Sequence, residues 1–257
     1  MLKGLYTAYT GLANEQNRMD VLTNNLANAS TVGYKKEGAT SQAFDDILSY
    51  KIKDVSETPN TAKRMGTLNM GVKIGENYTD FSQGSFRVTG NTFDLALAGE
   101  GFFTVQFTNK AGETSTKYTR DGSFTLDTTG YLVTSDGDYV MGTNGRIRLN
   151  PHLDTSISSD GVISQDGNPV ATLRISDFQD YDYLEKYGEN YYQTVNGFRP
   201  KAAEAQVKSG YLEMANVQVV SEMVNLIAIT RAYESNQKIV QTYDETMDTA
   251  VNQIGRV

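Results

Sequence analysis

The fold of this chain is indicated first by one stretch near its start, Asn24-Asn25-Leu26-Ala27-Asn28-Ala29-Ser30-Thr31-Val32-Gly33-Tyr34-Lys35. A second distinctive stretch near the other end reads Asn216-Val217, then Glu222-Met223-Val224, then Arg231-Ala232-Tyr233-Glu234-Ser235-Asn236. Both lie in apolar, helix-like sequence, whereas an enzyme keeps its most specific residues around a pocket. We therefore expect the two ends of the chain to form its working surface.

The first stretch belongs to a helix predicted over residues 3–29. One face of this helix is marked by alternating steps of four and three residues. The positions of that face are Leu5, Tyr9, Leu12, Gln16, Met19, Thr23 and Leu26. Asn28 and Gly33 follow as the signals that end a helix.

The C-terminal stretch predicts a longer helix with a coiled-coil-like seam. The seam positions are Met223, Leu226, Thr230, Tyr233, Gln237, Val240, Asp244, Met247, Val251 and Ile254. A second apolar stripe on a neighbouring face consists of Val217, Val220, Val224 and Ile227. A helix that is apolar on two faces must contact more than one partner. We therefore expect this helix to pack against neighbouring subunits as well as against the N-terminal helix.

Between the helices, the sequence changes to short apolar runs separated by turn signals. Asp-Gly and Asn-Gly pairs are typical of hairpin turns between short strands. They occur at Asp121-Gly122, Asp136-Gly137, Asn144-Gly145, Asp160-Gly161, Asp166-Gly167 and Asn196-Gly197. The runs between them predict strands at 93–97, 102–107, 131–134, 139–141 and 170–175.

The predicted fold class is α+β, with three parts. An antiparallel, mainly-β domain is expected over residues 75–207. Residues 1–35 and 208–257 are expected to pair as a coiled-coil-like terminal domain of two long helices. Residues 36–74 are predicted to form an extended connector, because 56–67 is polar and turn-rich, although 44–48 could form a helix or a strand.

Composition excludes several classes of function. The chain has no cysteine, so disulfides and thiolate chemistry are absent. Its net charge of -8 disfavours nucleic-acid binding. No run of residues approaches the 18 apolar residues of a membrane span, and the N-terminus lacks the apolar core of a signal peptide.

No constellation of catalytic, cofactor-binding or metal-binding residues emerges. His152, the single histidine, lies in loop-like sequence without a scaffold for a catalytic triad. Gly99-Glu100-Gly101 is followed by a strand-like run instead of a helix, so it favours a tight turn over a phosphate loop. The acidic run Asp177 to Glu185 lacks the central glycine of a calcium loop. We predict no enzyme activity and no cofactor.

Tyrosines are concentrated in one segment of the β domain, at Tyr181, Tyr183, Tyr187, Tyr191 and Tyr192. Such a cluster could form a carbohydrate-binding platform. Tyrosine is also common at protein interfaces, because it combines apolar area with a hydrogen-bonding tip. We favour a subunit contact.

Four motifs in a fixed order resemble the axial proteins of the bacterial flagellum, a family of rod, hook and hook-associated subunits. The motifs are 24–35, Thr89-Gly90-Asn91 through Gly99-Glu100-Gly101-Phe102-Phe103, Tyr118-Thr119-Arg120-Asp121-Gly122-Ser123-Phe124, and the stretch from Leu212-Glu213 to Asp244. The resemblance implies a structural subunit of the basal-body rod, which polymerises into a helical tube between motor and hook. The terminal helices would line the inner wall and the β domain would form the outer layer.

The resemblance also implies partners and a location. The partners would be further copies of the chain, other rod and hook proteins, and the flagellar type III export apparatus, which exports subunits without a cleaved signal. The location would be the basal body in the cell envelope, without insertion into a membrane. Alternatives are a hook or hook-associated subunit and, more distantly, a β-sandwich carbohydrate-binding or adhesin module.

The expected polymerisation interface combines helix-seam residues with asparagines. Buried asparagines are costly unless they are hydrogen-bonded, so we expect them where hydrogen bonds set register. The predicted interface residues are Leu22, Asn24, Asn25, Leu26, Asn28, Gly33, Tyr34, Asn216, Val220, Met223, Val224, Leu226, Ile227, Arg231, Tyr233, Asn236, Val240 and Met247.

Overall fold

The computed structural model describes residues 2–51, 63–109, 112–195 and 200–254. The chain divides into two compact units. The helical unit comprises the chain up to Leu26, residues 37–79 and the chain from Val219 onward. The β unit comprises residues 27–36 and 80–218. The chain therefore crosses between the units at four points along its length.

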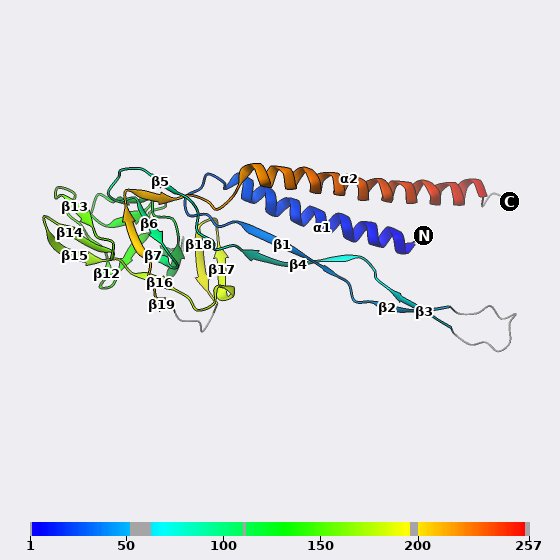
Figure 1. The fold of residues 1–257 in the computed structure, drawn as a ribbon, viewed down its shortest axis with the longest axis horizontal. Coiled ribbons are helices and arrows are strands. Elements are labelled where there is room, and N and C mark those ends of the chain that lie inside the picture. Colours follow the sequence, from blue (N-terminus) through cyan, green and yellow to red (C-terminus); the bar gives the residue numbers. More distant parts are fainter. Residues whose placement is uncertain (1, 52–62, 110–111, 196–199, 255–257) are drawn as a thin grey trace. The chain divides into compact units, whose positions relative to one another are not determined.

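The helical unit contains two long helices and a narrow ladder of strands (Figure 1). Its elements are α1 (Leu2–Ala27), β1 (Glu37–Ala43), β2 (Ile47–Lys51), β3 (Lys63–Leu68), β4 (Val72–Thr79) and α2 (Val219–Thr249), which continues as a π-helical turn over Ala250–Ile254. β1 pairs with β4 and β2 pairs with β3, both antiparallel. The stretch predicted as an extended connector thus contains paired strands, and residues 52–62 of it lie outside the described residues.

Helices α1 and α2 contact each other where α1 has small residues. A Cβ atom added at Gly11 would lie 2.9 Å from Asn236 Nδ2, and one added at Gly4 would collide with the Tyr243 ring. The most buried row of α2 steps by four and three residues. Its positions are Glu222, Leu226, Ile229, Tyr233, Asn236, Val240, Tyr243, Met247 and Ala250.

The structure buries only some positions of the predicted seams. On α2, Leu226, Tyr233, Val240 and Met247 occupy the buried row as predicted. Most of the alternating positions lie one residue away from that row and are exposed: Met223, Gln237, Asp244 and Val251. On α1, Tyr9, Gln16 and Thr23 are likewise exposed, whereas Ala8 and Val21 are buried. The reason is the close approach at glycine, which brings small and polar residues to the contact instead of large apolar ones.

The β unit is an assembly of short antiparallel strands. They are β5 (Phe86–Val88), β6 (Leu95–Ala98), β7 (Phe102–Thr108), β8 (Thr114–Thr119), β9 (Phe124–Leu126), β10 (Leu132–Thr134), β11 (Tyr139–Gly142), β12 (Gly145–Arg146), β13 (Thr155–Ile157), β14 (Val162–Gln165), β15 (Asn168–Thr172), β16 (Ile175–Asp177), β17 (Leu184–Tyr187), β18 (Tyr191–Thr194), β19 (Lys201–Ala202), β20 (Gln206–Ser209) and β21 (Tyr211–Glu213), with a 3-10 turn at Tyr181–Tyr183.

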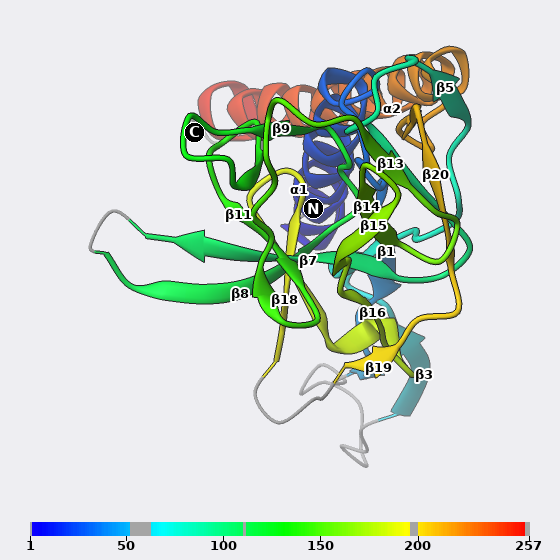
Figure 2. The ribbon, with the colours of Figure 1, turned by 90° about the vertical axis from the view of Figure 1, so that its left-hand side faces the viewer.

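The main sheet of the β unit runs in the order β17-β18-β8-β7-β11-β10-β9, with β12, β16 and β19 branching from it. β13, β14 and β15 form a separate sheet, β20 pairs with β6, and β21 pairs with β5. Figure 2 shows the β7–β8 hairpin extending to one side of this unit. The mainly antiparallel body predicted from the sequence is confirmed.

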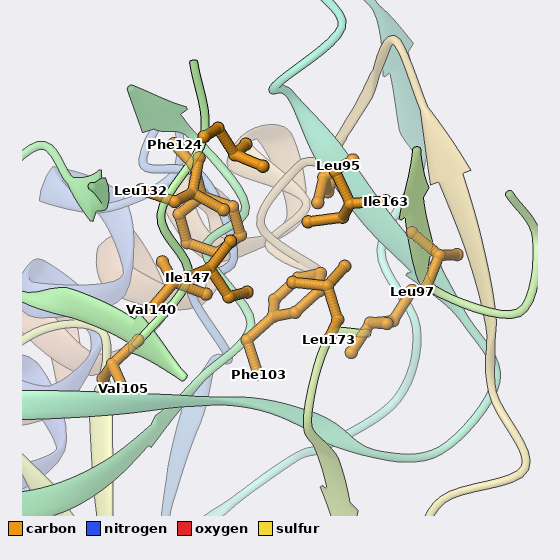
Figure 3. Packing of buried hydrophobic residues seen from close by; sticks show 12 residues of the cluster. Leu95, Leu97, Phe103, Val105, Phe124, Leu132, Val140, Ile147, Ile163 and Leu173 are labelled. Atoms are coloured by element: carbon orange, nitrogen blue, oxygen red, sulfur yellow. The ribbon is translucent and has the colours of Figure 1, made fainter. Parts of the chain in front are cut away.

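The hydrophobic core of the β unit is one cluster of aliphatic and aromatic side chains (Figure 3). Phe103 and Phe124 meet edge to face with their ring centroids 5.1 Å apart. A second, aromatic cluster is formed by Phe102, Tyr118, Phe178 and Tyr192.

Several predicted turns lie between paired strands. At Asp166-Gly167, between β14 and β15, both residues have positive φ, 50° and 80°, as a two-residue hairpin turn of type I′ requires. Asp136-Gly137 connects β10 with β11, and Asn144-Gly145 connects β11 with β12. Asn196-Gly197 lies outside the described residues. Neither helix, over the described residues, is apolar and long enough to cross a membrane.

Candidate assembly surface and buried ion cluster

Three charged side chains from distant parts of the sequence meet inside the β unit. Lys35 Nζ lies 2.7 Å from Glu213 Oε1, and Arg120 Nη1 lies 3.3 Å from Glu213 Oε2. All three side chains are buried. We call Lys35, Arg120 and Glu213 the buried ion cluster.

Hydrogen bonds with the backbone add to this cluster, whereas Arg120 Nε has no hydrogen-bond partner among the described residues. Lys35 Nζ donates to Ser82 O at 2.7 Å, Gly84 N donates to Glu213 Oε1 at 2.9 Å, and Arg120 Nη2 donates to Gly99 O at 2.9 Å. Burial lowers the pKa of the Lys35 ammonium, and the Glu213 carboxylate opposes that change. Two cations thus share one anion in a desolvated place, which makes Glu213 the residue on which the cluster depends.

Asn216 ties together three segments that lie next to crossing points between the units. Its Oδ1 accepts from Lys36 N at 2.8 Å, and its Nδ2 donates to Asp80 O at 2.8 Å. Asp80 N in turn donates to Lys36 O at 2.9 Å. A single carboxamide therefore holds the entering and leaving segments of the β unit in register.

The distinctive N-terminal stretch makes similar local contacts. Asn25 Nδ2 donates to Glu37 O at 2.7 Å and Asn25 Oδ1 accepts from Glu37 N at 2.9 Å, so its amide pairs with the start of β1. Gly33 has φ of 69° and packs directly against the backbone of Arg120 and Asp121, where no side chain fits. Tyr34 is fully buried, and Lys186 Nζ lies 4.4 Å from its ring centroid.

An exposed apolar stripe runs along the first turns of α2. Val220 is 76% exposed, Val224 61%, Ile227 53% and Met223 49%. Val219 beside them is also exposed. Such a contiguous row of large apolar side chains on a surface is typical of an interaction site. We call Val219, Val220, Met223, Val224 and Ile227 the α2 stripe.

The predicted interface residues fall into three groups. Five have their side chains or backbones fixed inside the subunit: Asn25, Asn28, Gly33, Tyr34 and Asn216. Seven are half-buried on the two helices: Leu22, Leu26, Leu226, Tyr233, Asn236, Val240 and Met247. Six are exposed: Asn24, Val220, Met223, Val224, Ile227 and Arg231. The hydrogen bonds seen for Asn25 and Asn216 are made within one chain.

Sequence reasoning missed the buried ion cluster. Arg120 and Glu213 both stand in the distinctive motifs, which was the available signal, but nothing in their spacing pairs them with Lys35. Ser82, Gly84 and Gly99 contribute backbone groups, which carry no sequence signal at all.

The structure also places the other candidates from the sequence. His152 is exposed, and its backbone N–H donates to Asn150 Oδ1 at 3.1 Å. Tyr192 is buried in the aromatic cluster, and Tyr181 packs against it while donating to Asp177 Oδ1 at 2.8 Å. Among the described residues, no three histidine or acidic side chains are placed to hold a metal ion.

Comparison with known families gives three matches along the chain. The model described as "Flagella basal body rod protein" matches residues 5–35, "Flagellar hook protein FlgE/F/G D1 domain" matches residues 96–165, and "Flagellar basal body rod FlgEFG protein C-terminal" matches residues 208–254. The buried ion cluster takes one residue from each matched region or its immediate neighbourhood.

Relatives match over nearly the whole length. "Flagellar basal-body rod protein FlgG" of Bacillus subtilis (strain 168) is 36% identical over 275 residues, with 98% of this chain and 99% of the relative covered. "Flagellar basal-body rod protein FlgF" of Caulobacter vibrioides is 32% identical, with 97% and 98% covered. "Flagellar hook-basal body complex protein FlhO" of Bacillus subtilis is 30% identical, with 100% of both covered.

Proposed function

Since the chain belongs to the family of flagellar basal-body rod proteins and is a structural subunit of the rod, we propose that its copies polymerise into a helical tube. In this tube, the same two different surfaces meet at every contact, and such contacts extend indefinitely when the rotation does not close a ring. The tube acts as a drive shaft between motor and hook. Further partners are other rod and hook proteins at its ends.

The observation that carries this proposal is the division of α2 into two faces. One face contains the row from Glu222 to Ala250 that is turned toward the rest of its own unit. The α2 stripe remains exposed in the single chain. Each Val, Met or Ile side chain moved from water into a packed contact contributes roughly 1.5–3 kcal/mol. Burying the α2 stripe against a second copy would therefore supply a large part of the association energy.

We further propose that α1 and α2 pair in the manner of a coiled coil. The buried row of α2 repeats every seven residues, as Leu226, Tyr233, Val240 and Met247 show. Gly4 and Gly11, also seven residues apart, face Tyr243 and Asn236. This pairing would form the platform that presents the α2 stripe to the next subunit.

Export is the part of the function that the N-terminus suggests. We propose that the chain reaches the basal body through the flagellar type III apparatus without losing an N-terminal segment. α1 begins at Leu2, so a cleavage within the first turns would remove helix that contains Gly4 and its contact with Tyr243. The test is the N-terminal sequence of the protein recovered from purified basal bodies, where removal of the first turns would contradict the proposal.

The polymerisation proposal is tested by Val224→Asp and Ile227→Asp. Both positions are exposed, so the variants should fold normally, but a carboxylate in a closed apolar contact is strongly unfavourable. We expect the variants to be absent from purified hook–basal bodies of the native host by quantitative mass spectrometry. The matched control is Ser235→Asp, an exposed polar position on the same helix, which should be incorporated normally.

Normal incorporation of both stripe variants would show that the α2 stripe is not a subunit contact. Circular dichroism of the isolated variants must match the unchanged protein, so that loss of incorporation reports the contact and not the fold. The copy number of the unchanged protein separates rod from hook, since a hook contains far more subunits than a rod.

A further inference from the structure

The β unit contains a pocket of about 500 Å³ that plays no part in the proposed assembly contact. It lies between the segment that follows α1, the β10–β11 turn and the β17–β18 turn. The lining residues that matter for its chemistry are Phe107, Asp121, Asp136, Tyr187, Glu189 and Asn190. We call it the acidic aromatic pocket.

The charge of the pocket lining has one sign. Among the described residues that line it, Asp121, Asp136 and Glu189 carry carboxylates, and no lining residue carries a positive charge. Burial raises the pKa of the Asp121 carboxyl, hydrogen bonds from Ser123 and Asn190 oppose this change, and the nearby Asp136 adds to it. A positive charge in the pocket would offset the effects of burial and of Asp136.

The hydrogen-bond acceptors of the pocket also favour a positively charged ligand with N–H donors. Asn190 Oδ1 is buried and has no hydrogen-bond partner among the described residues. Asp136 is exposed, and its Oδ2 accepts from the Tyr191 hydroxyl at 3.4 Å, so this carboxylate can accept further donors at the mouth of the pocket. An unsatisfied buried acceptor is costly, and a ligand with several N–H groups removes that cost.

Aromatic rings supply the apolar wall. Phe107 lies edge to face with Tyr187 at 5.4 Å between ring centroids, and 6.1 Å from Tyr191. Rings of this kind attract cations: Lys117 Nζ already lies 3.7 Å from the Tyr187 ring centroid. A metal ion would not use such walls, and the described carboxylates are not arranged to hold one.

We propose that the acidic aromatic pocket binds an organic cation, a guanidinium or alkylammonium group on an aliphatic stem. The charged head donates to Asp136, Glu189 and the Asn190 carboxamide oxygen. The stem lies against the aromatic wall. The group comes either from an arginine or lysine of a second copy or from a free cationic solute.

The test is calorimetric titration of the full-length protein with N-acetyl-arginine amide. The neutral isostere N-acetyl-citrulline amide serves as the ligand control. We expect heat of binding for the first compound only, and about tenfold weaker affinity in Asp136→Asn. Tyr187→Leu keeps apolar area but removes the ring and should also weaken binding. Asp160→Asn, an exposed Asp-Gly turn position outside the pocket, should bind as the unchanged protein does.

Three results would overturn the proposal. They are equal binding of the citrulline compound, binding of N-acetylglucosamine in its place, and no heat with the arginine compound at millimolar concentration. The source of the cation is separated by the self-association of Asp136→Asn, because this variant weakens the pocket whichever cation a second copy contributes. Weakened self-association of Asp136→Asn assigns the cation to a second copy. Unchanged self-association assigns it to a free solute. The titration uses single chains, so its failure leaves the proposed polymerisation intact.

Discussion

Replacing Glu213 by glutamine should destabilise the β unit more than any other single change in the buried ion cluster. The variant keeps the side-chain shape but leaves Lys35 and Arg120 as two buried cations around a neutral amide. Breaking a buried ion pair by removing one partner costs about 3–5 kcal/mol. At about 2–4 °C per kcal/mol for a domain of this size, Tm should fall by roughly 6–20 °C.

The net charge left in the cluster distinguishes the variants. Lys35→Met leaves the Arg120–Glu213 pair, which is neutral as a whole. This variant should therefore lower the free energy of unfolding by only about 1–2 kcal/mol, because of the lost hydrogen bonds. Lys201→Met breaks the exposed contact to Asp177, where the charged atoms are 3.8 Å apart, and should cost less than about 1 kcal/mol.

The measurement is urea unfolding of the full chain followed by tyrosine fluorescence. The chain has no tryptophan, and Tyr118 and Tyr192 in the aromatic cluster report on the β unit. If Lys35→Met destabilises the protein as much as Glu213→Gln does, the excess of buried positive charge is not what makes Glu213 important, and the reasoning fails.

Further expectations concern glycine, pH and helix contact. Gly33→Ala should lower the free energy of unfolding by at least about 1–3 kcal/mol, because φ is positive and backbone atoms of another segment block the added carbon. Gly137→Ala, at a position with φ of 89° and open space, should lower it by about 1–2 kcal/mol. Equal losses for the two variants in urea unfolding would contradict the packing argument. The folded-state pKa of Asp121 is raised above 3.8, so the native state binds more protons there and unfolding free energy falls as pH rises from 3.8 through that raised pKa. In Asp121→Asn, the midpoint of urea unfolding should no longer fall over this pH range. A pH profile identical to that of the unchanged protein would refute this assignment to Asp121. Gly11→Leu should separate the terminal helices and lower the melting temperature of the helices, measured by circular dichroism. Gln16→Leu, at an exposed position of α1, should leave that temperature unchanged. Equal effects would show that Gly11 is not a contact point.

Much of the fold could be predicted because it depends on local signals. The spacing of apolar residues located both helices, and the Asp-Gly and Asn-Gly pairs located hairpin turns such as Asp166-Gly167. Leu226 and Val240, which lie on the most buried row of α2, could be placed on one helix face for the same reason. Each of these features is determined by residues that lie within a few positions of it in the sequence.

The features that could not be predicted depend on distant or unremarkable residues. The contact face of α1 was predicted to contain Tyr9, because spacing patterns favour large apolar side chains. The contact with α2 uses Gly11 instead. The ion cluster joins Lys35 to Glu213 across 178 residues, and no periodicity connects them. The role of Asn216 could not be read either, because its partners are backbone groups of Asp80 and Lys36.

The distance along the sequence between Lys35 and Glu213 limits the order in which contacts can form during synthesis. A chain is synthesised from its N-terminus, so Lys35 and Arg120 must wait for their shared carboxylate until 178 further residues after Lys35 have been added. The core strands from Leu95 to Val207 can pack before that moment, since their contacts lie among themselves. Closure of the ion cluster therefore cannot precede synthesis of the C-terminal segment. It reports that the C-terminal segment has arrived, and only then are the ends of the β unit fixed in register.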